Sequence, residues 1–327
     1  MVDISKIFEK DKKEKSKKEN KEKLKEEIKE KITPKEAEIK VEKNIDYNIN
    51  EIYKELYSLI KELYIKKFSK EHFKRLEEIF EYIKNSLEYS EFDFFNLFFS
   101  DYQDLDDYLF FHVVNVAILS IIVGNYIKLE NLKDIFIGGL FHDIGLANFL
   151  DLIREKRKLT DEEYKKIKRH PEIGVKILRQ FELNSDILKI VEQTYERIDG
   201  FGYPYNIKEK DFILQSQLIS ICNKYEALTH KRPYRDRYNI FDTIKIIIED
   251  KGFVSYNIVK NFIDRVGIFP PTTEIILNTK EKGIVVRLNI GYPLRPKARI
   301  FFDTNGKKLE VPKEIDLLEN KSLYIVF

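Results

Sequence analysis

From about residue 105 to residue 265 the sequence carries apolar residues at the three- and four-residue spacing of amphipathic helices, with few glycines or prolines inside the periodic segments. A stretch of this length can bury its apolar faces only by packing helices against one another. The helical pattern stops at Pro270 and Pro271, and short apolar runs separated by turn dipeptides such as Asn-Gly follow. Such runs are typical of strands and hairpins. The sequence therefore predicts a mainly α fold, a helical bundle followed by a small C-terminal β module.

Changes of pattern along the chain divide it into four regions. Residues 1–47 consist largely of lysine, glutamate, isoleucine and leucine, a mixture that buries too little apolar surface to offset its loss of conformational entropy. We predict a disordered or loosely helical tail there. Apolar residues at helical spacing predict extra N-terminal helices over residues 48–100 and the main helical domain over 101–268, before the β tail of 269–327. Within this tail we expect strands near residues 274–277, 283–288, 298–302 and 322–327.

The composition limits the classes of function. With 43% hydrophobic residues the 327-residue chain can bury a sizeable core, and 58 basic residues nearly balance 56 acidic ones. A net charge of +2 gives no reason to expect nucleic acid as a partner. Lysine and glutamate alternate in the tail, so we interpret it as a solvated extension. The alternative is an electrostatic arm for nucleic acid or an anionic membrane.

Two observations bear on the cellular compartment. Cys222 is the only cysteine, so no intramolecular disulfide can form and a reducing cytoplasm is expected. It falls in the apolar run LISIC, where we predict a buried core residue. The most apolar long run, residues 113–127, is short for a bilayer and contains Asn115 and Asn125. We therefore predict a cytoplasmic protein without a membrane span.

His112, His142 and His170 fall in the helical middle of the chain at spacings near thirty residues. Asp143 directly follows His142 in the otherwise apolar string GGLFHDIG. Burying a carboxylate is costly unless it is paired or binds a metal, and imidazole nitrogens with a carboxylate oxygen suit a divalent transition metal. These residues are therefore candidate metal ligands. The alternative is structural: Asp143 caps the next element and His142 is a satisfied core residue.

Further motifs follow in a fixed order. HPEIG begins at His170, ERIDGFGYP begins at Glu196, and NKYEALTHKRPYR begins at Asn223. The glycines of the middle motif allow positive φ and its proline stiffens the exit, so it predicts a tight, shaped loop. We call this segment the GYP loop, and its residues are Asp199, Gly200, Phe201, Gly202, Tyr203 and Pro204.

In this order and spacing the motifs resemble the HD-GYP family, helical metal-dependent phosphodiesterases that hydrolyse the second messenger cyclic di-GMP. The resemblance runs from His112 to the C-terminus, where the last residues look like the small β tail of such domains. It implies an HD-type helical bundle that holds a divalent metal such as iron or manganese. It would make His112, His142 and Asp143 ligands of a first ion, with Asp143 bridging to a second ion that His170 also binds.

The sequence departs from the family at several ligand positions. Thr194 and Tyr195 stand where the family has two adjacent histidines, and Asn223 stands where it has an aspartate. A second ion would then keep too few protein ligands for stable binding. Asn223 offers a neutral amide oxygen to the first ion, although the lost carboxylate weakens cation binding. We predict one ion at most, with Asp143 as the catalytic residue.

Other parts of a nucleotide pocket are present. The residues that would bind phosphate or stack on a base are Arg232, Arg235, Lys224 and Tyr203. The alternative for the two arginines is ordinary surface ion pairing with Asp236 or Glu226. His230 is interpreted as a surface residue of a loop rather than a ligand.

Two kinds of function are compatible with these residues. The first is an HD-GYP-type phosphodiesterase with an impaired metal site, in which the arginines neutralise the phosphate. The second is a catalytically inactive sensor of cyclic di-GMP or a related nucleotide, or a protein-interaction scaffold, that signals through its N-terminal helices. Protein partners would bind these helices, and a homodimer is compatible with the sequence.

Overall fold

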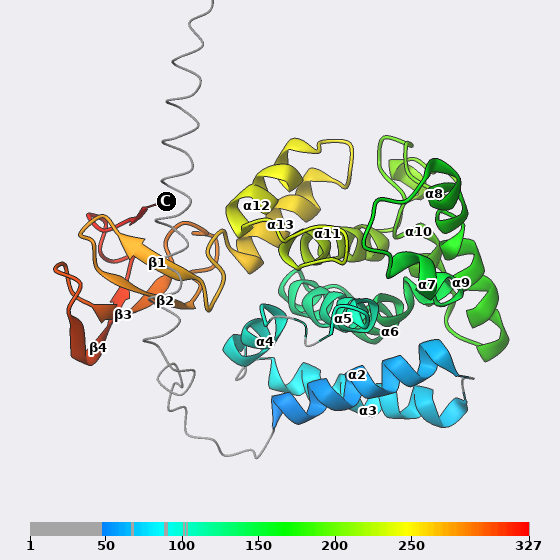
Figure 1. Ribbon diagram of the computed structural model, residues 1–327, viewed down its shortest axis with the longest axis horizontal. Coiled ribbons are helices and arrows are strands. Elements are labelled where there is room, and N and C mark those ends of the chain that lie inside the picture. The colour runs from blue at the N-terminus through cyan, green and yellow to red at the C-terminus, as the bar shows by residue number, and fades with distance from the viewer. Residues whose placement is uncertain (1–47, 67–68, 88–90, 101, 103, 327) are drawn as a thin grey trace, which may run out of the picture. The chain divides into compact units, whose positions relative to one another are not determined.

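The computed structural model describes residues 48–66, 69–87, 91–100, 102 and 104–326. The chain is mainly helical there and ends in a small antiparallel sheet (Figure 1), which confirms the predicted fold class. The lysine- and glutamate-rich tail predicted over residues 1–47 lies outside the described residues.

The helices follow one another closely along the chain. In order they are α2 (Ile49–Ile65), α3 (Lys70–Ser86), α4 (Glu91–Phe98), α5 (Tyr108–Tyr126), α6 (Leu132–Phe141), η2 (Ile144–Phe149), α7 (Leu150–Ile153), α8 (Asp161–Ile167), α9 (His170–Leu178), η3 (Arg179–Phe181), α10 (Ser185–Gln193), η4 (Glu209–Asp211), α11 (Leu214–Thr229), α12 (Ile240–Glu249) and α13 (Tyr256–Val266). Local chemistry sets several of their starts. Thr160 and Glu163 form a capping box at α8, and Asn239 accepts a hydrogen bond from the first turn of α12.

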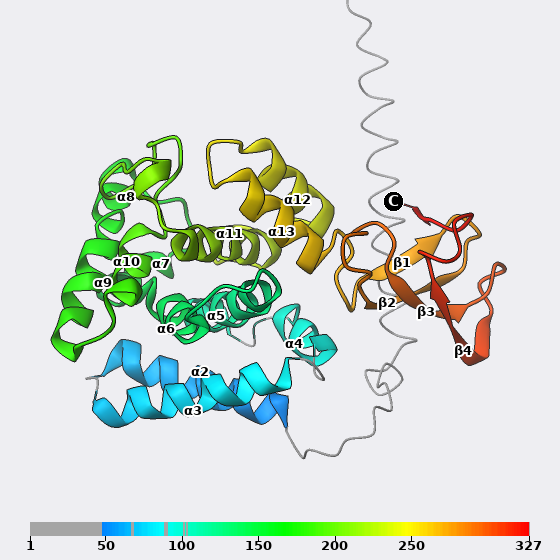
Figure 2. The ribbon, with the colours of Figure 1, turned by 180° about the vertical axis from the view of Figure 1, so that it is seen from behind.

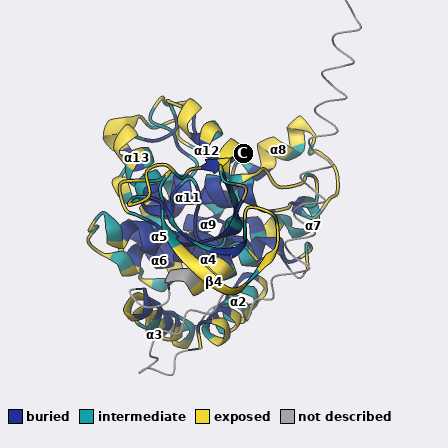
Figure 3. Cartoon of the chain, turned by 90° about the vertical axis from the view of Figure 1, so that its left-hand side faces the viewer, coloured by how far each residue is buried: buried dark blue, intermediate teal, exposed yellow. Residues whose placement is uncertain are grey.

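Helix α5 lies in the centre of the helical core. It is apolar on nearly every side and most of its residues are buried, which is the pattern of a helix surrounded by protein. It packs against α2, α6, α11 and α13. Figure 3 shows buried residues on the facing sides of these helices and exposed residues on the outer ones. The free cysteine, Cys222 in α11, is fully buried as predicted, and burial raises the pKa of its thiol to about 12.

Two described segments, Tyr108–Tyr126 and Leu132–Ile153, are long and apolar enough to cross a membrane. In the first, 89% of the most apolar window is buried inside the protein, and in the second 67%. The second segment is also divided into α6, η2 and α7. Packing in the helical core is therefore a sufficient reason for their apolar composition, and the absence of a membrane span stays a prediction.

The C-terminal sheet has the strand order β4-β3-β2-β1-β5, and all paired neighbours are antiparallel. The strands are β1 (Glu274–Leu277), β2 (Lys282–Arg287), β3 (Lys297–Phe302), β4 (Lys308–Asp316) and β5 (Ile325–Val326). Four of them lie where strands are predicted. The sequence gives no apolar signal for β4, because this strand is mostly exposed and polar and contains Pro312. It lies at a sheet edge, where one side of the backbone needs no partner and proline is tolerated.

The N-terminal helices are part of the helical core. Helix α2 packs on α5 and α3 packs on α6 (Figure 2). The buried Tyr53 hydroxyl on α2 donates a hydrogen bond of 2.7 Å to the Asn115 side chain of α5. Nearer the surface, the Tyr57 hydroxyl donates to Asp107 at 2.7 Å, and Lys61 forms an ion pair with the same carboxylate.

We expect Tyr53→Phe to lower the free energy of unfolding by about 1–3 kcal/mol, because it leaves the buried Asn115 oxygen without this donor. Tyr57→Phe is the matched control, since Asp107 keeps Lys61 and solvent, and we expect it to cost less than about 1 kcal/mol. Urea unfolding followed by circular dichroism measures both. Equal losses of unfolding free energy in the two variants would show that the buried Tyr53 hydrogen bond contributes no more than the partly exposed hydrogen bond of Tyr57.

Candidate metal centre

Helices that are distant in the sequence bring four polar side chains together. His112 projects from α5, His142 and Asp143 directly follow α6, and His170 is the first residue of α9. All four are almost completely buried. Gly145 makes the approach of η2 to α9 possible, because a Cβ there would lie 1.9 Å from the His170 carbonyl oxygen. A larger residue at this position would separate His170 from the other three.

Backbone carbonyls orient two of the imidazoles. His142 Nδ1 lies 2.7 Å from the Gly139 carbonyl oxygen, and His170 Nδ1 lies 2.9 Å from that of Ile167. A carbonyl only accepts, so each Nδ1 carries a proton and each Nε2 is left to face Asp143. Both Nε2 atoms are buried, and neither makes a hydrogen bond of good geometry with the described residues. This is the arrangement by which metal-ligating histidines are oriented in proteins.

His112 is oriented by a carboxylate instead. Its Nδ1 contacts the buried Glu226, and its Nε2 lies 3.6 Å from Asp143 Oδ2. Burial lowers the pKa of His112 well below its usual range, and the nearby Arg232 guanidinium lowers it further. The imidazole is therefore neutral near pH 7, with its Nε2 lone pair directed toward Asp143.

The Asp143 carboxylate lies among these three nitrogens. Its Oδ2 is 3.5 Å from His142 Nε2 as well as 3.6 Å from His112 Nε2, and its Oδ1 is 3.2 Å from His170 Nε2. Burial alone would raise the pKa of Asp143, but the surrounding imidazoles outweigh it and hold this pKa far below its usual range. An ionised carboxylate thus faces three imidazole Nε2 atoms at 3.2–3.6 Å. Imidazole nitrogens and a carboxylate that converge on one point in this way are a set of metal ligands.

The donor set fits a single divalent ion. One atom each of His112, His142 and Asp143 lie within 4.8 Å of one another. Two imidazole nitrogens and one carboxylate oxygen are a common ligand set for iron, manganese or zinc, with further positions open to water or substrate. The other interpretation, that the Asp143 side chain caps the following element, does not apply, because no capping hydrogen bond of this side chain is found at η2.

A tyrosine contacts the same Asp143 oxygen as His170. The Tyr195 hydroxyl donates a hydrogen bond of 2.7 Å to Asp143 Oδ1, and the Asn223 side chain hydrogen bonds with the same hydroxyl. Thr194 points elsewhere, because its hydroxyl donates to the Ile190 carbonyl oxygen at 2.7 Å. At the two positions where the family has adjacent histidines, the Thr194 hydroxyl therefore bonds to its own helix and the Tyr195 hydroxyl donates to Asp143. Tyr195 is therefore hydrogen bonded to both Asp143 and Asn223, and neither Tyr195 nor Asn223 brings a charge to the centre.

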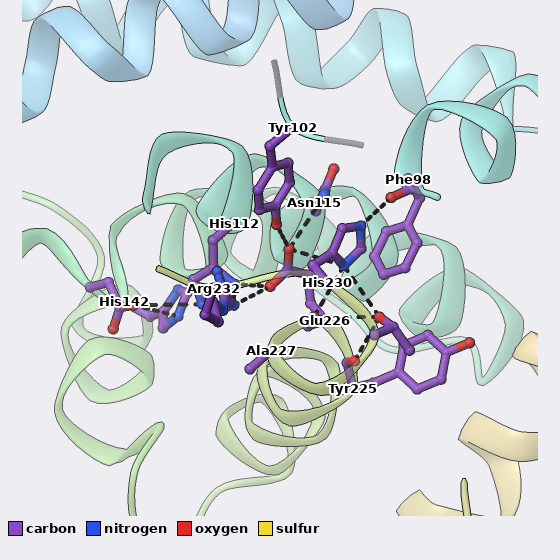
Figure 4. A network of polar contacts seen from close by, with 12 residues as sticks. Phe98, Tyr102, His112, Asn115, His142, Tyr225, Glu226, Ala227, His230 and Arg232 are labelled. Atoms are coloured by element: carbon purple, nitrogen blue, oxygen red, sulfur yellow. Dashed lines mark hydrogen bonds and ion pairs between the residues drawn. The ribbon is translucent and has the colours of Figure 1, made fainter. Parts of the chain in front are cut away.

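Behind His112 lies a buried polar network centred on Glu226 of α11 (Figure 4). The Glu226 carboxylate accepts from Arg232 Nη2 at 2.6 Å and also contacts His112 and the Tyr102 hydroxyl. Arg232 Nη2 lies 3.1 Å from His112 Nδ1, and its guanidinium carbon lies 4.8 Å from the centre of the Tyr108 ring. Arg232 therefore forms an ion pair with Glu226 in the interior, not at the surface.

Two features of this network differ from the sequence predictions. His230 is buried, not a surface residue, and its Nε2 donates to the Phe98 carbonyl oxygen at 2.5 Å. Glu226 is predicted from the sequence only as a surface ion-pair partner of the arginines, but it is fully buried. Its spacing in the sequence does indicate burial. It lies four residues after the predicted core residue Cys222, on the same face of a helix.

The other predicted phosphate-binding residues face away from this centre or are already paired. Arg235 donates to the Ala227 carbonyl oxygen and, at 2.9 Å, to that of Asp236. Lys224 pairs with Asp250 at 2.5 Å, and Arg197 binds the same carboxylate at 2.7 Å. Hydrogen bonds from Arg197 and Lys224 lower the pKa of Asp250 to about 2 despite its partial burial.

The GYP loop is anchored from both of its ends. The buried Glu196 carboxylate accepts from the backbone nitrogens of Tyr205, at 2.6 Å, and Ile207, at 3.2 Å. Asp199 pairs with Arg197 at 2.8 Å, Gly200 has a φ of +79°, and the peptide bond between Tyr203 and Pro204 is cis. The loop carries the Tyr203 ring to a stacked position 5.0 Å from that of Tyr195. Tyr203 thereby covers the side of the centre where Tyr195 and His170 lie.

Comparison with known proteins agrees with this architecture. Residues 115–256 match the family model of the HD domain, and residues 275–327 match the KOW domain associated with HD domains. Cyclic di-GMP phosphodiesterases from Pseudomonas aeruginosa and Borreliella burgdorferi are each 28% identical, over 64% and 62% of this chain and 51% and 55% of their own. The chain thus spans about half the length of the curated relatives it matches. A solved HD-GYP-type protein from Bdellovibrio bacteriovorus shares the fold, with a TM-score of 0.57 and 17% identity over 70% of this chain and 74% of that one.

We expect Glu226→Gln to lower the free energy of unfolding by about 3–5 kcal/mol, because Arg232 then stays buried without a counter-charge. The matched variant combines Glu226→Gln with Arg232→Met, which removes both charges and should recover most of the loss. Chemical denaturation measures both proteins. A double variant as unstable as the single one would contradict the ion pair as the source of the loss.

Proposed function

We propose that this chain, whose residues 115–256 form an HD domain of the HD-GYP family, binds cyclic di-GMP or a related cyclic dinucleotide and hydrolyses a phosphodiester bond with at most one divalent ion. His112, His142 and Asp143 would hold the ion, and Asn223 is a further candidate ligand through its amide oxygen. Iron and manganese suit this nitrogen and oxygen set. The relatives' names supply the substrate class, and the residues of this chain supply the rest of the proposal.

The strongest support is the buried Asp143 carboxylate, which faces three imidazole Nε2 atoms at 3.2–3.6 Å. Burial lowers the pKa values of His112 and His142, which favours the neutral form that binds metals. Arg232 does not balance the Asp143 charge, because its own charge is matched by Glu226. A divalent cation among these ligands would balance it, and when bound it supplies Lewis-acid activation of water and of a phosphoryl oxygen.

The surrounding residues have separate roles in this proposal. Glu226 and the Gly139 carbonyl keep His112 and His142 in the tautomers that present Nε2. Arg232 Nη1 is buried without a hydrogen-bond partner in the described part of the chain and lies beside His112, so it is a candidate phosphate donor. The Tyr203 ring would stack on a base once Tyr195 or Lys168 moves off it.

A specific observation favours the second candidate function, a receptor with little turnover. The four residues of the centre are at most 3% exposed, and Tyr195 and Tyr203 lie over one side. A phosphodiester reaches the ion only if this cover moves, so binding at the rim without cleavage is the simpler outcome. In either case we place the protein in the cytoplasm, with α2 and α3 as the surface for protein partners or a second copy.

We expect Asp143→Asn to weaken Mn²⁺ binding at least about 100-fold and to abolish hydrolysis of cyclic di-GMP, because it removes the only charged ligand of the set. Asp151→Asn changes an exposed carboxylate of α7 and serves as the control, which should match the wild type. Calorimetric titration with Mn²⁺ and chromatography of the nucleotide read the two effects separately. Unchanged Mn²⁺ affinity in the Asp143 variant would refute the metal assignment.

We expect the double substitution Thr194→His and Tyr195→His to raise the metal content from about one to about two ions per chain, because it adds two imidazoles beside His170 and releases Asp143 Oδ1. Tyr195→Phe releases the same oxygen without adding a ligand and should stay near one ion. Elemental analysis after reconstitution with Mn²⁺ counts the ions. Two ions already in the wild type would contradict the mononuclear site.

A further inference from the structure

Lys168 is a partly buried lysine whose ammonium group lies beside two aromatic rings. It follows the last residue of α8, and its Nζ lies 5.0 Å from the centre of the Tyr164 ring and 5.3 Å from that of Tyr203. Glu172, one helical turn further along the chain, pairs with Arg169 at 3.3 Å instead. Lys168 forms no ion pair within the described residues. Two ring faces hold and orient a cation, but they do not cancel its charge.

Only one layer of aromatic rings separates Lys168 from the candidate metal centre. The Tyr203 ring under its ammonium group stacks on Tyr195 at 5.0 Å and meets the His170 ring edge-on at 6.2 Å. The Tyr195 hydroxyl in turn donates to Asp143. On the other side of Lys168, Tyr164 is 48% exposed. The cluster of Tyr164, Lys168 and Tyr203 therefore extends from the protein surface to the tyrosines that cover the centre.

A cyclic dinucleotide carries two phosphodiester groups, and only one of them can lie at the reacting centre at a time. The second must lie nearby, next to a nucleoside whose base presents a flat face. A positioned ammonium group without a counter-charge, beside two tyrosine rings, matches an anionic group flanked by a base. Neither Lys224 nor Arg235 offers this, because Asp250 and backbone carbonyls already occupy them.

We propose that Lys168, held between Tyr164 and Tyr203, is an anion subsite for the phosphodiester that is not being cleaved. This inference rests on the proposed binding of a cyclic dinucleotide and adds to it a residue outside the metal-ligand motifs. Lys168 touches neither the candidate ligands nor Arg232 in the contacts that the structure records. It therefore acts on nucleotide affinity and not on metal binding.

The test is the dissociation constant of cyclic di-GMP for the full chain, measured by calorimetry at two salt concentrations. Lys168→Met keeps the apolar stem and removes the charge, and we expect a dissociation constant about tenfold higher, with a shallower salt dependence. Lys168→Arg keeps a cation and should stay within about threefold of the wild type. Lys166→Met, an exposed lysine in the last turn of the same helix, is the matched control and should not change the affinity.

Mn²⁺ affinity is measured for the same variants and should be unchanged in all of them. If the wild type binds cyclic di-GMP and Lys168→Met binds it equally well, the subsite is wrong while the proposed function stands. If Lys166→Met weakens binding as much as Lys168→Met, the effect is general surface charge and the subsite is again wrong. If the wild type binds no cyclic di-GMP with or without Mn²⁺, the proposed function and the subsite are both overturned.

Discussion

The ionised carboxylate of Asp143 is buried where three histidines direct their Nε2 atoms toward it. Each group would be well solvated in water, and burying the carboxylate costs free energy unless it is paired or binds a metal. The surrounding structure keeps them in place through the carbonyl oxygens of Gly139 and Ile167 and the carboxylate of Glu226. A fold that orients acceptors toward one point in this way is arranged for a cation, and this requirement connects the HD architecture to its proposed chemistry.

Orienting the candidate ligands requires further buried polar groups, and each of these needs a partner of its own. Glu226 orients His112, but as a buried charge it needs Arg232 as its counter-ion. The Asn115 side chain approaches the same carboxylate at 3.5 Å and accepts from Tyr53 of α2. A continuous set of polar contacts therefore joins the N-terminal helices to a candidate ligand.

The three residues that stand in place of HD-GYP ligands, Thr194, Tyr195 and Asn223, satisfy one another's or neighbouring hydrogen-bonding groups. A tyrosine at position 195 is long enough to reach Asp143 Oδ1, and Asn223 can donate to the tyrosine hydroxyl, which an aspartate could not do. Thr194 satisfies its own hydroxyl on the Ile190 carbonyl oxygen and leaves no unpaired polar group. Thr194 and Tyr195 thus leave no unpaired hydroxyl where the family has ligands of a second ion, and Asn223 stands at a ligand position of the first. Tyr195 in turn stacks on Tyr203 of the aromatic cluster that holds Lys168.

The sequence by itself determined the class of fold and the ligand candidates, because helical periodicity, turn dipeptides and the order of the motifs are local properties of the chain. It placed four of the five strands and the buried Cys222, but not β4, whose exposed edge position needs no apolar pattern. The burial of His230 and Arg232 could not be predicted from the sequence, because a polar residue near a helix end fits the surface as well as the interior, whereas Glu226 carries a signal in its spacing from Cys222. Only the tertiary structure brought Tyr195 to Asp143, 52 residues away, and Lys168 to Tyr203. Such contacts depend on side-chain reach across packed helices, and no spacing along the chain encodes that distance.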